Sequence, residues 1–448
     1  MTLTSEQQCA VDAFEDFLDK PDETLFALLG WAGCGKSFTA SHMYKMMEER
    51  RSAFDEMLWL APTWKATHIS GHFLLSQGAR FETRYDSFKH MGGTMVLTTT
   101  QQALGIAPVI DDKQSEDKMK FGKVNRGTVR DLRPRYIVID EVSMLSRENL
   151  KQVNAMAKEV GAKVLIIGDP GQLPPVGEEE INWGGIKNRY ELKTIMRQSG
   201  DSAIPHLAEA IRTGQEWREI KGNGVEHVRN AASAFLDTVD VPSAIEEERD
   251  VFVAYRNAIV NKVQEAACQK VYGHGRNHVE VEQTVIAQSS IAQYVRDHHT
   301  GMMSEERICN QDSLLVVDKL GAGQWGEIAE VMTNGNTFVV EYLTQEALTN
   351  PKHPYRVELA SRAERARALQ EEFKKDKRVD SDRRAAWKSF FELKDNTVLS
   401  FAHPFALTSH KSQGSSYRRA FVDARDIESF TSRGLYVAAT RPKETLFI

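Results

Sequence analysis

A glycine-rich segment, Gly30–Ser37, most constrains how this chain can fold. Its sequence, GWAGCGKS, fits the pattern G-x-x-x-x-G-K-[ST]. The segment follows an apolar run at Thr24–Leu29 and precedes Lys36–Glu49, where apolar residues recur at helical spacing. A strand, a phosphate-binding loop and a helix in this order begin a parallel sheet, so the pattern predicts an α/β fold around a nucleotide site.

The residue types of this loop suit a triphosphate. Glycines at Gly30, Gly33 and Gly35 allow backbone N–H groups to turn toward phosphate oxygens. Lys36 supplies positive charge to the β and γ oxygens, and the hydroxyl of Ser37 holds Mg²⁺. We therefore expect ATP and Mg²⁺ as cofactors.

Two acids follow another apolar run, Tyr136–Ile139. Ligands of parallel sheets lie at the carboxyl ends of the strands, which is where Asp140 and Glu141 stand. We expect Asp140 to hold the metal and Glu141 to polarise the attacking water as a general base. The alternative is a solvated turn, which the upstream phosphate loop disfavours.

A further apolar run, Val164–Ile167, leads into Gly168–Val176, with the sequence GDPGQLPPV. Gln172 stands in this loop, where its amide can hydrogen-bond the γ-phosphate or the attacking water and sense the state of the nucleotide. In the alternative interpretation the glycine and proline residues make a rigid loop, and Gln172 is its solvated tip.

Two arginines far along the chain are candidates for stabilising transition-state charge. Arg197 follows the segment LKTIM, and Arg441 follows YVAAT. Both are expected in a second core, from which an arginine reaches the phosphates only when the two cores close around the nucleotide. For either arginine alone, a surface salt bridge is the plainer interpretation.

Composition disfavours several classes of protein. Apolar runs fall short of the ~20 residues that a membrane span needs, and Met1–Asp19 lacks the basic start of a secretory signal. The scattered cysteines form no C-x-x-C pair, which favours a reducing cytosol and disfavours a zinc site or a disulfide framework. A net charge of −6 is mild evidence against a nucleic-acid binder, although a groove can be locally positive. The cysteines are Cys9, Cys34, Cys268 and Cys309.

At about 150 residues per domain, the length of 448 residues suggests roughly three domains. The first core is expected over 1–86 and 131–187, interrupted at 87–130 by an insertion that holds a β-hairpin or, alternatively, is a disordered loop. The second core is expected over 188–272 and 397–448, where it resumes with a strand at Thr397–Phe401.

Residues 273–396 are expected to interrupt the second core. The charged stretch at about 358–394 predicts one or two projecting helices. Its Trp387 and Phe391 either contact a neighbouring element or, as we favour, pack the helices against each other. The short β-like runs that predict a small barrel before them are Ser313–Val317, Ile328–Met332 and Thr337–Leu343.

Six motifs in a fixed order resemble those of superfamily 1B DNA helicases, and most of all the RecD-like branch with its compact Dda-like members. The motifs are the phosphate loop, Asp140–Met144, Gly168–Val176, Arg197, Leu407–Gly414 and Tyr436–Arg441. The resemblance covers both cores and implies two RecA-like motor domains of the P-loop NTPase class. It also implies an inserted pin hairpin, an inserted SH3-like β-barrel and a helical tower.

The resemblance assigns further roles to residues at matching positions. Gln7, within the segment LTSEQ, would read adenine, while Gln413 and Gly414 would couple the DNA to the nucleotide. Phe121 would be the aromatic residue of the hairpin that splits the duplex, unless it packs the hairpin onto its domain. The residues that would contact single-stranded DNA are Pro62, Thr63, Asn257, Thr408, His410 and Lys411.

Two segments depart from the family pattern. Arg84–Ser87 stands where a Thr-Ile-His-like signature is usual, which leaves the base contacts there open. Asn310–Asp312 lacks the glycine of the usual Asn-Gly-Gln or Asn-Gly-Asp at the start of the barrel, so its turn geometry is open too.

The implied function is 5′-to-3′ ATP-dependent DNA unwinding, in phage or bacterial replication, recombination or repair. Implied partners are single-stranded and forked DNA and a single-stranded DNA-binding protein or replisome components. The chain would act as a monomer in the cytoplasm, or in the host cytoplasm if a phage encodes it. Alternatives are an RNA-directed or dual-substrate helicase and a nucleotide-switched DNA-binding module that does not unwind. A nuclease is disfavoured because no further acid cluster shows metal-ligand spacing.

Overall fold

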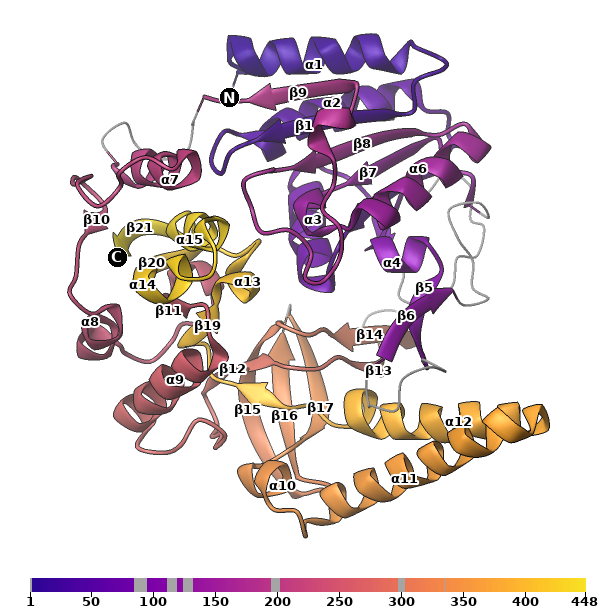
Figure 1. Ribbon diagram of the computed structural model, residues 1–448, viewed down its shortest axis with the longest axis vertical. Helices are drawn as coiled ribbons and strands as arrows, with labels where there is room; N and C mark the ends of the chain where they lie inside the picture. Colours follow the sequence, from indigo (N-terminus) through magenta and orange to yellow (C-terminus); the bar gives the residue numbers. More distant parts are fainter. Residues whose placement is uncertain are drawn as a thin grey trace.

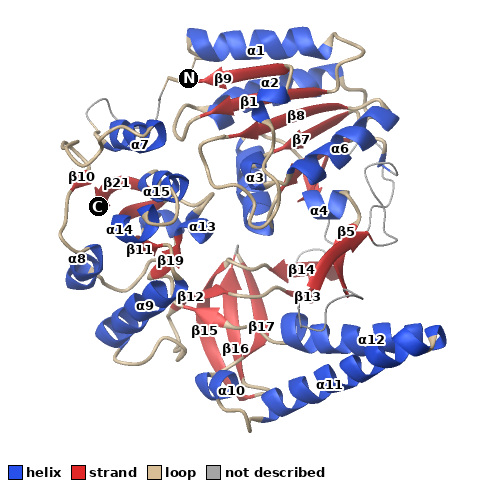
Figure 2. Cartoon of the chain, viewed as in Figure 1, coloured by secondary structure: helices blue, strands red, loops and turns tan. Residues whose placement is uncertain are grey.

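The computed structural model describes residues 2–83, 95–110, 119–123, 132–194, 202–296, 303–333 and 335–448. Figure 1 shows a parallel sheet at the top, a second parallel sheet below it, and an antiparallel sheet with a projecting helix pair at the bottom. Helices and strands alternate in the upper units, whereas strands dominate the lower sheet (Figure 2). The expected α/β fold is confirmed. No helix among these residues combines the length and apolar character needed to cross a lipid bilayer.

Within the described ranges, the first parallel sheet has seven strands in the order β3-β4-β2-β7-β8-β1-β9. They are β1 (Leu25–Gly30), β2 (Met57–Ala61), β3 (Phe81–Thr83), β4 (Met95–Thr99), β7 (Tyr136–Ile139), β8 (Lys163–Gly168) and β9 (Asn188–Leu192). The helices beside them are α1 (Ser5–Leu18), α2 (Lys36–Arg50), α3 (Trp64–Ser76), α4 (Thr100–Ala103) and α6 (Arg147–Val160).

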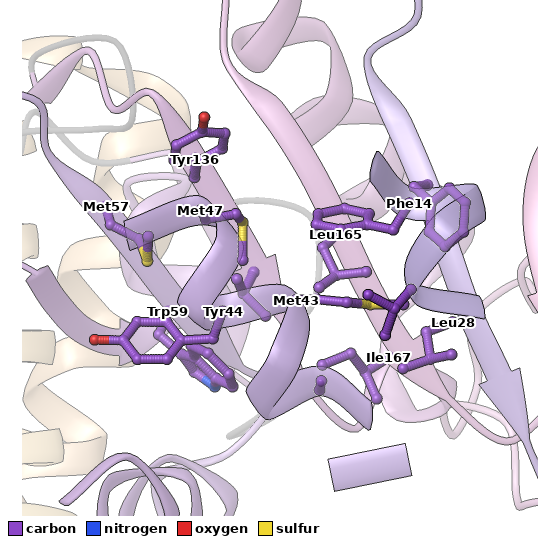
Figure 3. Close-up of a cluster of buried hydrophobic side chains, with 14 of the residues drawn as sticks. Phe14, Leu28, Met43, Tyr44, Met47, Met57, Trp59, Tyr136, Leu165 and Ile167 are labelled. Atoms are coloured by element: carbon purple, nitrogen blue, oxygen red, sulfur yellow. The ribbon is translucent and has the colours of Figure 1, made fainter. Parts of the chain in front are cut away.

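Apolar residues cover both faces of this sheet. On one face, Phe14 of α1, Leu28 of β1 and Met43 of α2 belong to one buried cluster (Figure 3). On the other face, α6 packs against β7 and β8. Strands buried on both faces are near-continuous apolar runs, which is why the sequence revealed most of them.

The boundaries expected for the first core need two corrections. β9 pairs in parallel with β1, so the segment expected to begin the second core at Asn188 belongs to the first sheet. β4 pairs in parallel with β2, so the insertion expected over 87–130 contains a strand of the core. The buried threonine run Thr98–Thr100 conceals this strand, because its residues are polar although their branched side chains suit a sheet. Beyond it, β5 (Ile106–Ile110) pairs antiparallel with β6 (Met119–Lys123).

The second parallel sheet has five strands in the described part of the chain, in the order β10-β21-β20-β11-β19. They are β10 (Val225–Glu226), β11 (Asp250–Ala254), β19 (Ala406–Thr408), β20 (Tyr417–Val422) and β21 (Pro442–Phe447). Its helices are α7 (Ile204–Thr213), α8 (Ala231–Thr238), α9 (Asn257–Tyr272), α13 (Ser409–Ser412), α14 (Ala424–Glu428) and α15 (Ser432–Ala439). Because β11 pairs with β19 and β20, this core is split around the residues between them, as expected.

The inserted sheet is antiparallel and, among the described residues, has five strands in the order β17-β16-β15-β12-β18. They are β12 (Thr284–Ala287), β15 (Ser313–Ala322), β16 (Glu327–Thr333), β17 (Asn336–Tyr342) and β18 (Phe401–Ala402). A separate ribbon pairs β13 (Ile291–Arg296) with β14 (Met303–Ile308). The strand expected at Thr397–Phe401 in the second core is wrong. β18 pairs with β12 instead, because Phe401 stacks on Tyr342 inside the inserted unit, with ring centroids 5.0 Å apart.

A projecting helix pair follows a short helix, α10 (Gln345–Thr349), and consists of α11 (Pro354–Lys375) and α12 (Asp380–Phe391) (Figure 1). Trp387 and Phe391 of α12 stack with ring centroids 5.7 Å apart. Trp387 lies in the apolar cluster that also holds Ala363 and Ala366 of α11. This confirms the interpretation that the two aromatic residues pack the helices against each other.

Candidate functional site

Gly30–Ser37 spans the last residue of β1, the loop after it and the first turn of α2, which is the strand–loop–helix order predicted. Gly33 and Gly35 have φ angles of 82° and 80°, in the left-handed region that favours glycine. Gly35 precedes α2 without a side-chain cap, so the first N–H groups of the helix can bind an anion. The ammonium of Lys36 donates to two carbonyl oxygens of the loop, both 2.8 Å away, which holds its charge over the loop.

Asp140 and Glu141 lie at the carboxyl end of β7. One oxygen of Asp140 accepts from the Glu141 N–H at 2.9 Å, and the other accepts from the Ser70 hydroxyl at 3.1 Å. Glu141 has a φ of 48°, a strained conformation for a residue with a side chain. Removal from water raises the pKa of both carboxyls, and the charge of Asp140 raises the pKa of Glu141 further. Lys36 and Arg441 oppose that shift, so both cations act on the Glu141 carboxyl.

A tyrosine of the second core connects two loops of the first. The N–H of Ala32 in the phosphate loop donates to the Tyr436 hydroxyl at 3.1 Å, and this hydroxyl donates to Oδ2 of Asp169 at 2.7 Å. Oδ1 of Asp169 accepts from the Gly171 N–H at 2.8 Å. Burial raises the pKa of Tyr436, so the hydroxyl keeps the proton that it donates. Hydrogen bonds thus join α15 to the phosphate loop and to the loop after β8.

Gln172 is buried, with 6% of its surface exposed, so it is not a solvated loop tip. Its Oε1 accepts from Nε2 of Gln413 at 2.9 Å. Gln413 and Gly414 follow α13, and Gly414 has a φ of 78° that favours glycine. The contact brings together two residues that the sequence singled out separately, one from each core.

Arg441 is buried at the same junction. Its guanidinium donates to the carbonyl oxygens of Val437 and Ser415, at 2.8 and 3.0 Å. Arg441 lines a cavity of about 250 Å³ whose other walls include Trp31 of the phosphate loop. Arg197, the other candidate, lies outside the residues that the structure describes.

Gln7 lies beside the phosphate loop and also caps a helix. Its Oε1 accepts from the Thr4 N–H at 3.1 Å, while the Thr4 hydroxyl accepts from the Gln7 N–H at 3.2 Å. This capping box begins α1. Nε2 of Gln7 donates to the Cys34 carbonyl oxygen at 3.5 Å. Gln7 therefore faces the nucleotide loop, and its reading of adenine stays a prediction.

Thr63 and Thr408 occupy equivalent places in the two cores. Thr63 follows β2 after Pro62, and its hydroxyl caps α3 by accepting from the Ala66 N–H at 3.2 Å. Thr408 ends β19, and its hydroxyl caps α13 by accepting from the Lys411 N–H at 3.3 Å. Each threonine thus stands at the carboxyl end of a parallel strand, where ligands of such sheets bind.

A second cavity, of about 120 Å³, lies between the second core and the inserted sheet. Asn257, Thr408 and Lys411 all line it, as three of the residues expected to contact DNA. The ammonium of Lys411 donates to Oε1 of Gln288 at 2.9 Å. Burial lowers the pKa of Lys411. The structure therefore brings a cation and polar side chains together in one cleft.

Three further predictions concerned His410, Phe121 and the segment Arg84–Ser87. His410 packs edge-on against Tyr255, with ring centroids 5.5 Å apart, and burial lowers its pKa. The backbone of Phe121 pairs with that of Pro108 in the β5–β6 ribbon, but its side chain lies outside the described part of the chain. The same holds for the whole of Arg84–Ser87.

Asn310–Asp312 makes the turn before β15 without a glycine. Gln311 takes a φ of 76°, the conformation that glycine favours. One oxygen of Asp312 accepts from the Cys309 N–H at 2.7 Å and so closes the turn. A left-handed turn therefore forms here at a cost of about 1–2 kcal/mol for the side chain of Gln311.

Residues 2–229 match the family model described as AAA domain, which covers the phosphate loop, the acids and Gln172. This chain belongs to the AAA domain family. A relative of this AAA-domain chain, the uncharacterized protein R530 of Acanthamoeba polyphaga mimivirus, is 24% identical over 507 residues, with 99% of each chain covered.

Two solved structures share the fold of this AAA-domain chain. Pif1 helicase from Candida albicans is 16% identical to this chain and superposes with a TM-score of 0.51. The alignment covers 100% of this chain and 94% of that one. Bacteroides Pif1 bound to single-stranded DNA is 15% identical to this chain and superposes with a TM-score of 0.50. The alignment covers 100% of this chain and 92% of that one. At such identities the similarity shows the fold.

Sequence reasoning missed two residues at the junction of the cores in this AAA-domain chain. Tyr436 appeared only as the first residue of a motif, and its hydroxyl bridge to Ala32 and Asp169 needs the folded chain. Arg212 of α7 stacks over Trp31, with its guanidinium carbon 3.8 Å from the ring centroid. Trp31 fills an unspecified position of the loop pattern, so no local signal pointed to this pair.

Proposed function

We propose that this chain is an ATP-dependent DNA helicase that moves 5′ to 3′ along single-stranded DNA and unwinds duplex DNA. The observation that carries the proposal is the junction of the cores, where Gln172 contacts Gln413 and Tyr436 contacts the phosphate loop. A bound nucleotide would alter contacts that the second core makes, and so turn hydrolysis into movement between the cores. The fold shared with Pif1 helicases supports the proposal.

The donors at the acid cluster suit Mg²⁺, which prefers oxygen ligands. The Ser37 hydroxyl and the Asp140 carboxylate would hold the ion, which neutralises phosphate charge when bound. The two hydrogen bonds that Asp140 accepts from Glu141 and Ser70 orient its carboxylate without using all of its lone pairs.

In the proposed hydrolysis step, the first core performs the chemistry. Glu141 takes a proton from the attacking water, and Lys36 stabilises charge on the β and γ oxygens. Gln172 orients the water or the γ-phosphate and passes the change to Gln413. Arg441, with Arg197, stabilises charge as the cores close.

In the proposed translocation step, the two cores grip DNA at equivalent places. Thr63 would contact the strand from the first core, and Thr408 and Lys411 from the second, with Asn257 beside them. Contacts of this kind bind the backbone without reading sequence. If closure and reopening alternate the strength of the two grips, each ATP moves the strand by one step.

Strand separation would use the inserted parts. The β5–β6 ribbon would be the pin, with Phe121 stacking on the base pair at the fork. The antiparallel sheet would be the SH3-like barrel, and α11 with α12 the tower that braces the pin. This arrangement would place the chain among RecD-like, Dda-like helicases of superfamily 1B.

The proposed substrates are single-stranded and forked DNA. The Pif1 structure solved with single-stranded DNA shares the fold of this chain, which supports that choice. A monomer acting in the cytoplasm, in replication, recombination or repair with a single-stranded DNA-binding protein or replisome components, fits the proposed motor.

The test is unwinding of one duplex with a 5′ tail beside a matched duplex with a 3′ tail. We expect unwinding of the 5′-tailed duplex and ATP hydrolysis stimulated by single-stranded DNA. Lys36→Ala should abolish both activities while the circular dichroism spectrum stays unchanged.

Three other outcomes would contradict the proposal. Preference for the 3′ tail would overturn the polarity, and stronger stimulation by a matched RNA oligonucleotide would favour an RNA-directed motor. ATP-dependent DNA affinity without strand separation on either duplex would favour a switched binding module.

A further inference from the structure

Three metal-ligating side chains meet where the first core contacts the inserted unit. Nδ1 of His68 lies 3.4 Å from Oδ1 of Asp312, and Nε2 of His68 lies 4.0 Å from Sγ of Cys309. Ligand atoms of the three residues, one from each, all lie within 4.8 Å of one another. His68 comes from α3, whereas Cys309 and Asp312 flank the turn before β15. The cluster therefore spans two units that are far apart in the sequence.

The atoms and their separations suit a tetrahedral Zn²⁺ ion. With Zn–N and Zn–O bonds of about 2.0–2.1 Å and Zn–S bonds of about 2.3 Å, neighbouring ligand atoms lie roughly 3.3–3.6 Å apart. The contact between His68 and Asp312 has this length already. One imidazole nitrogen binds the ion, and the three ligand atoms, one from each residue, lie within 4.8 Å of one another, so side-chain shifts of roughly one ångström complete the site. Three protein ligands leave the fourth position to water, and the His68 side chain is 19% exposed, which gives an ion access.

The protein itself satisfies these polar atoms poorly. Oδ2 of Asp312 accepts from the Cys309 N–H at 2.7 Å, which holds the carboxylate in place and leaves Oδ1 beside His68. Within the described residues, the buried Nδ1 of His68 forms no hydrogen bond, and its only ion-pair neighbour is Oδ1 of Asp312 at 3.4 Å. Buried polar groups without partners cost free energy, and a cation would engage the imidazole, the carboxylate and the sulfur together.

We propose that His68, Cys309 and Asp312 bind one divalent transition-metal ion of the zinc type, which clasps α3 to the inserted unit. As the sulfur–metal bond forms, the Cys309 thiol releases its proton to solvent, and no electron is transferred. The clasp would adjoin the second cavity, because Gln311 and Lys65 line that cavity. Gln311 stands between Cys309 and Asp312, and Lys65 lies one turn before His68 on α3. A bound ion would fix this wall of the cavity.

The test is titration of the metal-free full chain with Co²⁺ as a spectroscopic probe for the zinc site. We expect one equivalent to bind with the near-ultraviolet charge-transfer absorption of a thiolate–cobalt bond, and Zn²⁺ to displace it. His68→Gln and Cys309→Ser should each weaken binding by more than about 100-fold, since even outer-shell changes at metal sites cost about 10–100-fold. Neither ATP nor DNA takes part, so the result is separate from the helicase test.

Matched controls come from the same elements and residue types. His72→Gln changes an exposed histidine one turn further along α3, and Cys268→Ser changes a buried cysteine of α9, and both should keep the full absorption. Absence of the band from the unaltered chain would overturn the proposal. So would its persistence in both ligand variants, since the exposed Cys9 would then be its source. If Cys309→Ser does not fold, the soluble His68→Gln variant decides the matter.

Discussion

The two parallel-sheet cores share a plan but differ in what they bring to their junction. In each, a threonine at the end of a strand, Thr63 or Thr408, caps the next helix. In the part of the chain that the structure describes, the phosphate loop and its acids belong to the first core. The second core supplies a hydroxyl, an amide and a guanidinium, from Tyr436, Gln413 and Arg441.

This difference suggests that the first core carries out the proposed hydrolysis of ATP and that the second core responds to the state of the nucleotide. Lys36 acts electrostatically on the buried carboxyls of Asp140 and Glu141, and leaving a buried charge without compensation costs about 3–5 kcal/mol, so we expect this part of the first core to stay rigid. A neutral hydrogen bond contributes about 0.5–1.5 kcal/mol, so a nucleotide can exchange the Gln172–Gln413 contact easily. The contrast predicts that substitutions in the first core abolish turnover, whereas those at the junction uncouple it.

Glu141→Gln should have the largest effect, because it removes the proposed base and keeps the size of the side chain. We expect ATP turnover to fall about 10²–10⁴-fold while nucleotide affinity stays within a few-fold. Steady-state hydrolysis and equilibrium nucleotide binding measure the two quantities.

The pH profile is the control for this variant. Since removal from water raises the pKa of Glu141, the base takes up a proton at a pH above that of an exposed glutamate. Activity should fall as pH falls through that raised value, and the limb should vanish from the residual activity of Glu141→Gln. A variant that keeps full turnover would place the base elsewhere.

Tyr436→Phe tests the hydroxyl bridge between the cores. It removes the donor to the buried Asp169 carboxylate and the acceptor of the Ala32 N–H. Hydrogen bonds to charged groups contribute about 1.5–3 kcal/mol, and we expect the free energy of unfolding in urea to fall by about that amount. Tyr255→Phe is the matched control, because that ring packs on Phe430 and should lose less than about 0.5 kcal/mol.

A double-mutant cycle on Gln172 and Gln413 tests the contact between the cores. Residues in direct contact show coupling energies of about 0.5–3 kcal/mol, and we expect a value in that range for ATP hydrolysis stimulated by single-stranded DNA. Additive effects of the two alanine substitutions would show that the cores communicate by another route.

Thr63→Ala and Thr408→Ala compare the two proposed grips. Each loses a helix cap worth about 1 kcal/mol. α13 has 4 residues and α3 has 13, so the shorter helix depends more on its cap. We expect Thr408→Ala to weaken affinity for single-stranded DNA more, and serine at either place to restore it. An equal loss of DNA affinity in the two alanine variants would show that the two proposed grips do not differ in their dependence on the helix cap.

Gln311→Gly, in the unit that interrupts the second core, should have the smallest effect of these substitutions, and that effect is on stability. Because Gln311 has a φ of 76°, glycine relieves strain there, and we expect metal-free protein to gain up to about 1 kcal/mol of unfolding free energy. Thermal unfolding measures it, and a loss of stability would show that the Gln311 side chain makes contacts that outweigh the strain.

Much of the fold and the nucleotide site followed from local patterns. A loop of fixed spacing and an apolar run followed by an acid are each complete within a few consecutive residues. Lys36, Asp140 and Gln172 could therefore be identified from the sequence alone. The wrong boundaries concern β4, β9 and β18, whose membership of a sheet depends on partners distant in the chain. Tyr436 belongs to the same class, because its partners lie about 400 and 270 residues away.

The proposed metal clasp could not be predicted from the sequence for the same reason, because its ligands are distant along the chain. Scattered cysteines without paired spacing disfavoured a zinc site, and that judgement is sound for ligands carried on one short segment. His68 and Cys309 are 241 positions apart, and the packing of α3 against the inserted unit brings them together. Sequence spacing determines which residues share a loop or a helix face, whereas a metal ion responds to distances in space, which tertiary packing sets.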